Sequence, residues 1–412
     1  MRNYFRSFFS HSRNTVRYYI LVIALLLFLF FSNDFGLIDV QKTAIVMAAG
    51  IDREEDTFIV TSQIVIPKSS KQGQTESIQL VSRGKTVADA FKEINAKTGW
   101  YPKLVFCNLI LLGEKTAESN VFDALDFFLR DEYLSDRCYV ATCDGLAKDL
   151  LNSSAVAEPS GSVAMEKVLS DHAGRLGTVL PTSLKDFAIG YFSDSQSGFM
   201  PIIKPRPQQE EFGKSEQSGS SNSSQGQSSA SSSSENESAQ PKEKPVFSAS
   251  ETALFVGGKR VGTLNKEETF AFNTVNNALK LAPYSVAQGD ETATLSVRQN
   301  DKKVTLKVSD NRRVSLQIKV ELTAGLTDYS KAQNLNDVSD AGDVPQNLFR
   351  LAEKKLAAEI TQTFEKCRAV ECDLFGVLDR LEKYEKKHFH SLQNTALRGA
   401  ILDLSVHFKG VR

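Results

Sequence analysis

An uninterrupted apolar run near the N-terminus constrains the topology of this chain more than any other feature. Tyr18 to Phe31 are fourteen consecutive apolar or aromatic residues, and the polar Ser32 follows at once. The run is apolar on all sides, so it lacks the polar stripe that a surface helix of a globular domain carries. Four arginines precede it and no acidic residue occurs before Asp34, which is typical of a targeting signal whose basic side stays in the cytoplasm.

The run predicts an uncleaved membrane anchor, with residues 1–34 as basic flank and transmembrane signal-anchor. Fourteen helical residues rise about 21 Å, against about 30 Å of hydrocarbon; a snorkelling Arg17 and local thinning of the bilayer would allow them to span it. A cleaved secretion signal is the alternative, although the small residues of a cleavage site are missing around Phe31. We assign the anchor to Arg17, Tyr18, Leu25 and Phe31, and expect the bulk of the chain to lie outside the cytoplasm.

Composition excludes some classes of protein. The net charge of −1 provides no global basic field, so we expect no nucleic-acid partner. The five cysteines form no evident disulfide framework. Cys138/Cys143 and Cys367/Cys372 each enclose four residues, which is neither CxxC nor common zinc-finger spacing. We interpret the cysteines as small buried hydrophobic residues.

A serine-rich stretch divides the remaining chain. Residues 205–246 contain almost no apolar side chain, so they cannot bury enough surface to offset the entropy of ordering. They are predicted to be a disordered linker between an N-terminal region, 40–204, and a C-terminal domain, 247–412. The linker suggests that the two halves move relative to each other.

The first half alternates strand-like and helix-like segments. Residues 43–51 and 57–66 predict a hairpin around a charged turn. A strand then leads to a helix capped by Thr86, and residues 103–113 are apolar enough for a central strand covered on both faces. Further helices and one strand follow. The buried stripe of the Thr86-capped helix is predicted to be Val87, Ala90, Phe91 and Ile94.

The second half predicts an antiparallel meander, a long helix and a final strand. Gly257-Gly258 supply a hairpin turn, and Asn300-Asp301 and Asp310-Asn311 are predicted to separate three later strands. Apolar residues recur every three or four positions from about Gln346 to Arg368, which indicates an amphipathic helix. In the last strand Leu402, Leu404, Val406 and Phe408 alternate with Asp403, Ser405, His407 and Lys409, so one face is solvated. The fold class is therefore mixed α/β (α+β), with largely antiparallel sheets and packed helices beyond the anchor.

No motif in the sequence predicts catalysis, a cofactor or a metal. "RGKT" at Arg83 resembles a phosphate-binding loop, but the required earlier glycine is Gln79. His388 and His390 lack the carboxylate that a metal site of the HExxH kind would add. The charged "GIDREED" segment lacks the pattern of a calcium loop. We therefore expect no enzyme, with no catalytic, cofactor-binding or metal-binding residues.

The order of the landmarks carries a resemblance. "AIVMAAGIDREEDTFIVTSQIVIP", "SRGKTVADAFKEI", "KLVFCNLILLGEKTA" and "ALDFFLRDEYLSDRCYVATCDGLAKDLL" follow one another, and "TALFVGGKRVGTLNKEET", the long helix and "ECDLFGVLDRLEKYEKKHF" continue the series. This series is similar to the Ger(x)C family, the C subunits of spore germinant receptors. The resemblance covers roughly Ala44 to Arg412 apart from the linker.

Membership would imply a non-enzymatic subunit on the outer face of the spore inner membrane. The family's fold of three mixed α/β domains would place two subdomains in the region 40–204. The subunit would assemble with two integral membrane subunits, A and B, to start germination when nutrients bind, without a direct small-molecule ligand of its own. Family members are typically lipoproteins, whereas here the first cysteine is Cys107, so the anchor helix would replace the lipid. Two alternatives stay open: the extracytoplasmic substrate-binding protein of a transporter, and an extracellular hydrolase.

Overall fold

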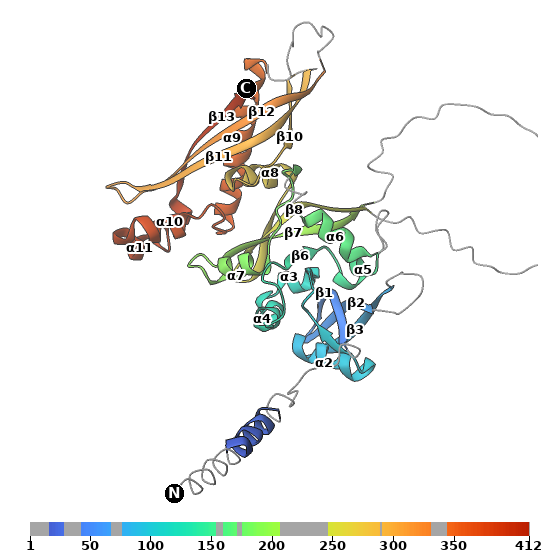
Figure 1. The fold of residues 1–412 in the computed structure, drawn as a ribbon. Coiled ribbons are helices and arrows are strands. Elements are labelled where there is room, and N and C mark those ends of the chain that lie inside the picture. The colour runs from blue at the N-terminus through green and yellow to red at the C-terminus, as the bar shows by residue number, and fades with distance from the viewer. Residues whose placement is uncertain are drawn as a thin grey trace, which may run out of the picture. The chain divides into compact units, whose positions relative to one another are not determined.

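The structure is a computed structural model that describes residues 16–28, 43–66, 76–153, 160–170, 175–206, 246–288, 291–330 and 344–411. The chain divides into two compact units, Met1–Thr43 and Ala44–Arg412. In the first unit, residues 16–28 form a helix whose side chains are all exposed. The second unit contains the sheets and the remaining helices (Figure 1).

The larger sheet of the second unit, sheet A, has nine strands in the described residues, in the order β3-β2-β1-β5-β6-β7-β8-β9 with β4 paired to β1. Its centre is parallel, because β1, β5, β6 and β7 pair in the same direction, while both ends are antiparallel. The strands are β1 (Thr43–Glu54), β2 (Thr57–Ile66), β3 (Glu76–Gly84), β4 (Tyr101–Lys103), β5 (Leu109–Leu112), β6 (Tyr139–Cys143), β7 (Ser197–Arg206), β8 (Val246–Val256) and β9 (Lys259–Leu264).

Helices cover both faces of sheet A, which explains why its central strands are apolar throughout. Every residue of β5 is buried, as expected for a strand between two layers. One face packs against α2 (Val87–Thr98), α4 (Phe122–Arg130) and α7 (Leu184–Phe192), and the other against α5 (Ala147–Asn152) and α6 (Gly161–Leu169). The short α3 (Glu114–Glu118) follows β5.

Local predictions for the first half are largely confirmed. Thr86 caps α2 by accepting a hydrogen bond from the Asp89 backbone N–H, and the buried residues of α2 are the four that the sequence predicts. β1 and β2 form the predicted hairpin. The predicted central strand is shorter than expected, because residues 104–107 form a turn before β5 begins.

The serine-rich linker connects two strands that pair with each other. Arg206 at the end of β7 lies opposite Val246 at the start of β8, so the predicted hairpin β8–β9 extends sheet A rather than opening a separate one. The expectation that the two halves move relative to each other is wrong at this junction. Antiparallel pairing over the length of β7 and β8 fixes both ends of the linker, whatever its composition.

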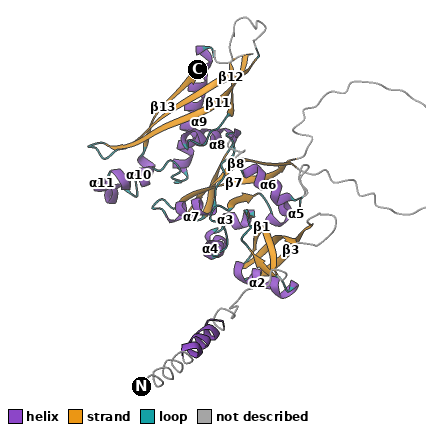
Figure 2. Cartoon of the chain, viewed as in Figure 1, coloured by secondary structure: helices purple, strands orange, loops and turns teal. Residues whose placement is uncertain are grey.

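The second sheet, sheet B, has four strands in the order β10-β11-β12-β13. Figure 2 labels three of them, β11, β12 and β13, near α9. β13 runs parallel to β12, and the other pairs are antiparallel. Its strands are β10 (Ala282–Gln288), β11 (Glu291–Val308), β12 (Val314–Tyr329) and β13 (Ile401–Gly410). The prediction of a turn at Asn300-Asp301 is wrong: both residues pair with β12 inside one continuous strand. Asn300 is held there because its buried side chain donates to the Thr274 carbonyl at 3.0 Å.

One core joins sheet B to its helices and to the end of sheet A. It contains Leu254 and Leu264 of β8 and β9, the inward residues of sheet B and the apolar face of α9. Polar contacts add to it: the buried Asn273 amide donates to the carbonyls of Gly177 and Val179. The helices are α8 (Lys266–Val275), α9 (Gln346–Ala369), α10 (Val377–Tyr384), α11 (Lys386–Leu392) and α12 (Ala396–Gly399). The mixed α/β class is therefore confirmed, with a parallel centre in sheet A.

Candidate functional site

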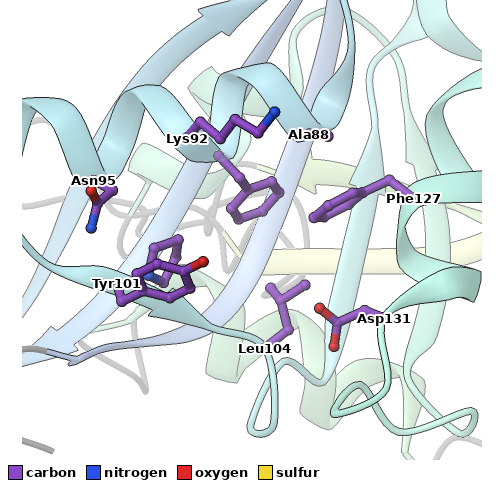
Figure 3. Close-up of a pocket in the computed structure, with 9 residues that line it drawn as sticks. Ala88, Lys92, Asn95, Tyr101, Leu104, Phe127 and Asp131 are labelled. Atoms are coloured by element: carbon purple, nitrogen blue, oxygen red, sulfur yellow. The ribbon is translucent and has the colours of Figure 1, made fainter. Parts of the chain in front are cut away.

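A groove lies between α2, β4 and α4. Its volume is about 300 Å³. The C-terminal end of α2 creates it, because Gly99 takes a left-handed conformation (φ +70°) and turns the chain back along the helix into β4. It is lined by Ala88, Phe91, Lys92, Asn95, Tyr101, Pro102, Leu104, Phe127 and Asp131 (Figure 3).

Aromatic side chains form the walls of this groove. Phe91 of α2 stacks on Phe127 of α4 with ring centroids 5.0 Å apart. Figure 3 shows Phe127 and Tyr101 on opposite sides of the opening, with Leu104 between them. Such packing between helices fixes the rings and leaves apolar surface facing the opening.

Three polar side chains of the groove already have partners. The Asn95 amide donates to the Trp100 carbonyl at 3.2 Å, and Lys92 lies 3.8 Å from Asp89. Asp131 accepts hydrogen bonds from the backbone N–H groups of Tyr133 and Leu134. Because a specific small-molecule site needs convergent polar groups, this groove fits an apolar contact surface better than a site for a polar ligand.

The turn that follows β4 exposes apolar side chains beside the groove. The Cys107 N–H donates to the Leu104 carbonyl at 2.9 Å, which places Val105 and Phe106 at the corners of the turn. Both are exposed, Phe106 to 54%. The sequence did not reveal this feature, since residues 103–113 look like one apolar strand. Their length, about twice that of an average strand, was the available signal.

Buried carboxylates in the described residues serve structural roles. Asp52 of β1 accepts hydrogen bonds from the Ala147 and Lys148 N–H groups at the start of α5, at 2.8 and 3.0 Å. Burial raises the pKa of Asp52. Asp373 accepts from the Val377 and Leu378 N–H groups at the start of α10, and burial raises its pKa also. Each carboxylate is occupied by a helix N-terminus, so neither is poised for catalysis.

A second pocket of about 280 Å³ lies between α8, β10 and α9. Three of its side chains bind one another: the Tyr284 hydroxyl donates to Glu359 at 3.0 Å, and the Lys355 ammonium lies 3.7 Å from the same carboxylate. Burial raises the pKa values of both Tyr284 and Glu359. These groups stabilise the packing of α9 on β10 and leave no unpaired acid or base among them.

The structure describes all five cysteines, and each is a buried free thiol. Burial raises the pKa of Cys372 to about 12, and burial also raises the pKa of Cys143. Low thiolate content and burial make such thiols inert. Their interpretation as small buried hydrophobic residues is confirmed.

The predicted anchor residues are only partly described. Arg17, Tyr18 and Leu25 lie on the helix of residues 16–28, exposed, and Phe31 lies outside the described residues. Among the helices that the structure describes, none combines the length and the apolar character that crossing a membrane requires. The described ranges also contain no group of three or more histidine, cysteine or acidic side chains arranged to hold a metal ion.

The fold and the site therefore define a mixed α/β protein with a partly aromatic groove and two buried carboxylates that bind helix N-termini. Residues 37–205 match the family described as "Spore germination protein N-terminal domain", and residues 250–405 match "Spore germination B3/ GerAC like, C-terminal". The two matches together span most of the chain in consecutive order. The chain belongs to this family of spore germination proteins, the germinant receptor C subunits, as the resemblance predicts.

A relative and a solved structure agree with this assignment. Spore germination protein B3 of Bacillus subtilis (strain 168) is 28% identical over 193 residues, 44% of this chain and 49% of that protein, so the match spans about half the length of that relative. The structure titled "Crystal Structure of the GerBC protein" matches with a TM-score of 0.51 and 16% identity, over 90% of this chain and 99% of that one. At that identity the likeness establishes the fold alone.

Proposed function

We propose that this protein is a membrane-anchored, non-enzymatic subunit of a spore germinant receptor. It works outside the spore inner membrane and assembles with two integral membrane subunits, A and B, to trigger germination when nutrients bind. The observation that carries the proposal is the consecutive match of both family domains over residues 37–205 and 250–405. The structural roles of Asp52, Asp373 and the Tyr284–Glu359 pair support a non-enzymatic role.

The anchoring part of the proposal rests on the N-terminal segment. Residues 16–28 are helical, their apolar side chains are exposed on all sides, and Tyr18 is 70% exposed. Exposed apolar surface all round a helix is stable in lipid rather than in water. We propose residues 1–34 as flank and anchor. The regions 40–204, 205–246 and 247–412 remain our proposed division of the rest.

The alternative of a substrate-binding protein needs two domains that close around a cleft on short hinges. In the described residues sheet A instead continues from β7 to β8, and Leu254 and Leu264 join the core of the C-terminal helices. The continuous sheet therefore favours a rigid receptor subunit over a binding protein whose two domains close around a ligand.

Deletion of Tyr18 to Phe31 tests the anchor and the function together. We expect the variant to appear in the soluble fraction of spores, to lose co-purification with the A and B subunits, and to lose the nutrient response. A control variant carries an unrelated apolar helix of the same length in place of this run, and we expect it to keep all three properties. A soluble deletion variant that still supports germination would contradict the proposal.

A further inference from the structure

The turn after β4 carries residues that a solvent-facing turn seldom has. Corner positions of β-turns favour glycine, proline, asparagine, aspartate and serine, which fit the backbone or bond to it. Here the corners are Val105 and Phe106, 46% and 54% exposed, in a turn closed by the Cys107–Leu104 hydrogen bond. Neither side chain belongs to a hydrophobic core of the described residues, so the turn presents about half of each one outward.

Two tyrosines extend the apolar surface around this turn. Tyr101 of β4 and Tyr133, beyond α4, are both more than half exposed. The Lys103 ammonium lies 4.6 Å from the centre of the Tyr133 ring. We call Tyr101, Val105, Phe106 and Tyr133 the end patch. Aromatic rings with polar tips, beside a lysine with a long apolar stem, are the side chains that favour the boundary between lipid and water.

The end patch lies along the edge of sheet A that contains the first residues of β1, where the chain enters the second unit. β4 pairs with β1, and the Asn108 N–H donates to the Met47 carbonyl, so the turn lies level with the first residues of β1. Only a dozen residue steps separate Phe31 from Thr43 in the sequence, which span about 40 Å at most. An anchored chain therefore keeps this edge of sheet A within that reach of the bilayer.

We propose that the end patch docks on the lipid bilayer, with Phe106 and Val105 entering the interfacial region. The inference rests on the proposed membrane anchor, and it adds a second contact that orients the second unit on the membrane. Asp131 and Glu132 lie next to Tyr133 in sequence, so the patch has no excess of positive charge. The contact is accordingly apolar: it needs no anionic lipid and persists at high salt.

Trp100 provides the measurement, because it is the single tryptophan of the chain and directly precedes Tyr101. The full-length protein is reconstituted into phosphatidylcholine vesicles containing lipids brominated at shallow or deep acyl positions. We expect shallow bromine to quench Trp100 emission more than deep bromine, equally in vesicles with added phosphatidylglycerol and at high salt. Unquenched emission from vesicle-bound protein would overturn the patch while leaving the anchor intact, whereas failure to enter vesicles would count against both.

Phe106→Glu is the test variant, and Ile401→Glu is its control. Ile401 on β13 is 52% exposed, which matches Phe106, but it belongs to sheet B. We expect Phe106→Glu to abolish quenching, Phe106→Leu to retain most of it, and Ile401→Glu to leave it unchanged, with all three variants folded by circular dichroism. Equal loss in the control would overturn the proposal. So would quenching that appears only after the integral membrane subunits are added, since the patch would then bind protein rather than lipid.

Discussion

Replacing the serine-rich linker with a four-residue turn should stabilise this protein. Within this linker, 39 residues separate Arg206 from Val246, which lie opposite each other in β7 and β8. The native strands therefore already meet where a tight hairpin would close them. If the halves were independent domains, the same replacement would force them together and would destabilise one or both.

The magnitude follows from loop-closure entropy. Closing a loop of about four residues instead of 39 lowers the entropic cost of closure by (3/2)RT ln 10, or about 2 kcal/mol. The described residues of the second unit number roughly 300, and an unfolding entropy of about 2.1 cal/mol/K per residue converts this gain into a rise of about 3 °C in melting temperature.

Differential scanning calorimetry on the full-length protein in detergent would measure this rise. A control with a scrambled linker of native length should melt at the wild-type temperature, because length and not sequence sets the effect. A protease site placed in the linker adds a second readout, since the nicked halves should remain together in size-exclusion chromatography. A lower melting temperature after shortening, or separation of the nicked halves, would refute the continuity of sheet A.

Four further predictions concern buried groups. Asp52→Ala should lower the free energy of unfolding by about 2–4 kcal/mol in denaturant titrations, because two N–H groups of α5 lose their acceptor; a change below 1 kcal/mol would contradict this capping role. Since burial raises the pKa of Asp52, its contribution to stability is complete below the ordinary carboxyl pKa and is lost as pH rises through the raised value. Wild type should therefore gain stability relative to Asp52→Asn as the pH falls from neutral toward about 4, and an unchanged difference would refute the shift. Gly113→Ala should lower the free energy of unfolding by about 1–3 kcal/mol in the same titrations, because a Cβ there would overlap the Asp52 carboxylate. An unchanged free energy of unfolding would contradict the close contact between Gly113 and Asp52. The five cysteines should resist thiol reagents until the protein unfolds, so rapid labelling of the folded protein would contradict their burial.

Local structure was predictable where local physics decides it. Thr86 and the spacing of Val87, Ala90, Phe91 and Ile94 specified α2, because a cap and a helical apolar stripe need only neighbouring residues. Gly257 and Gly258 specified the β8–β9 turn, since both adopt positive φ. The alternation of β13 predicted its solvated face, with His407 and Lys409 exposed and Phe408 buried.

The errors arose where distant contacts override local pattern. Asn300 looks like a turn residue, but the Thr274 carbonyl binds its amide and β12 pairs on both sides of it. The pairing of Arg206 with Val246 was invisible, because composition cannot show which strands meet across a linker. The end patch was hidden for a similar reason: Val105 and Phe106 resemble a strand until the turn closed by Cys107 and Leu104 is seen.

The role in germination is tested most directly with spores that lack this protein. These spores are exposed to nutrients and, separately, to calcium dipicolinate, which is expected to trigger germination at a step after the receptors. We predict that the nutrient response is lost while the response to calcium dipicolinate is unchanged, and that the wild-type chain restores the former. Spores that respond normally to nutrients, in a strain from which other receptors have been removed, would contradict a receptor function for this protein.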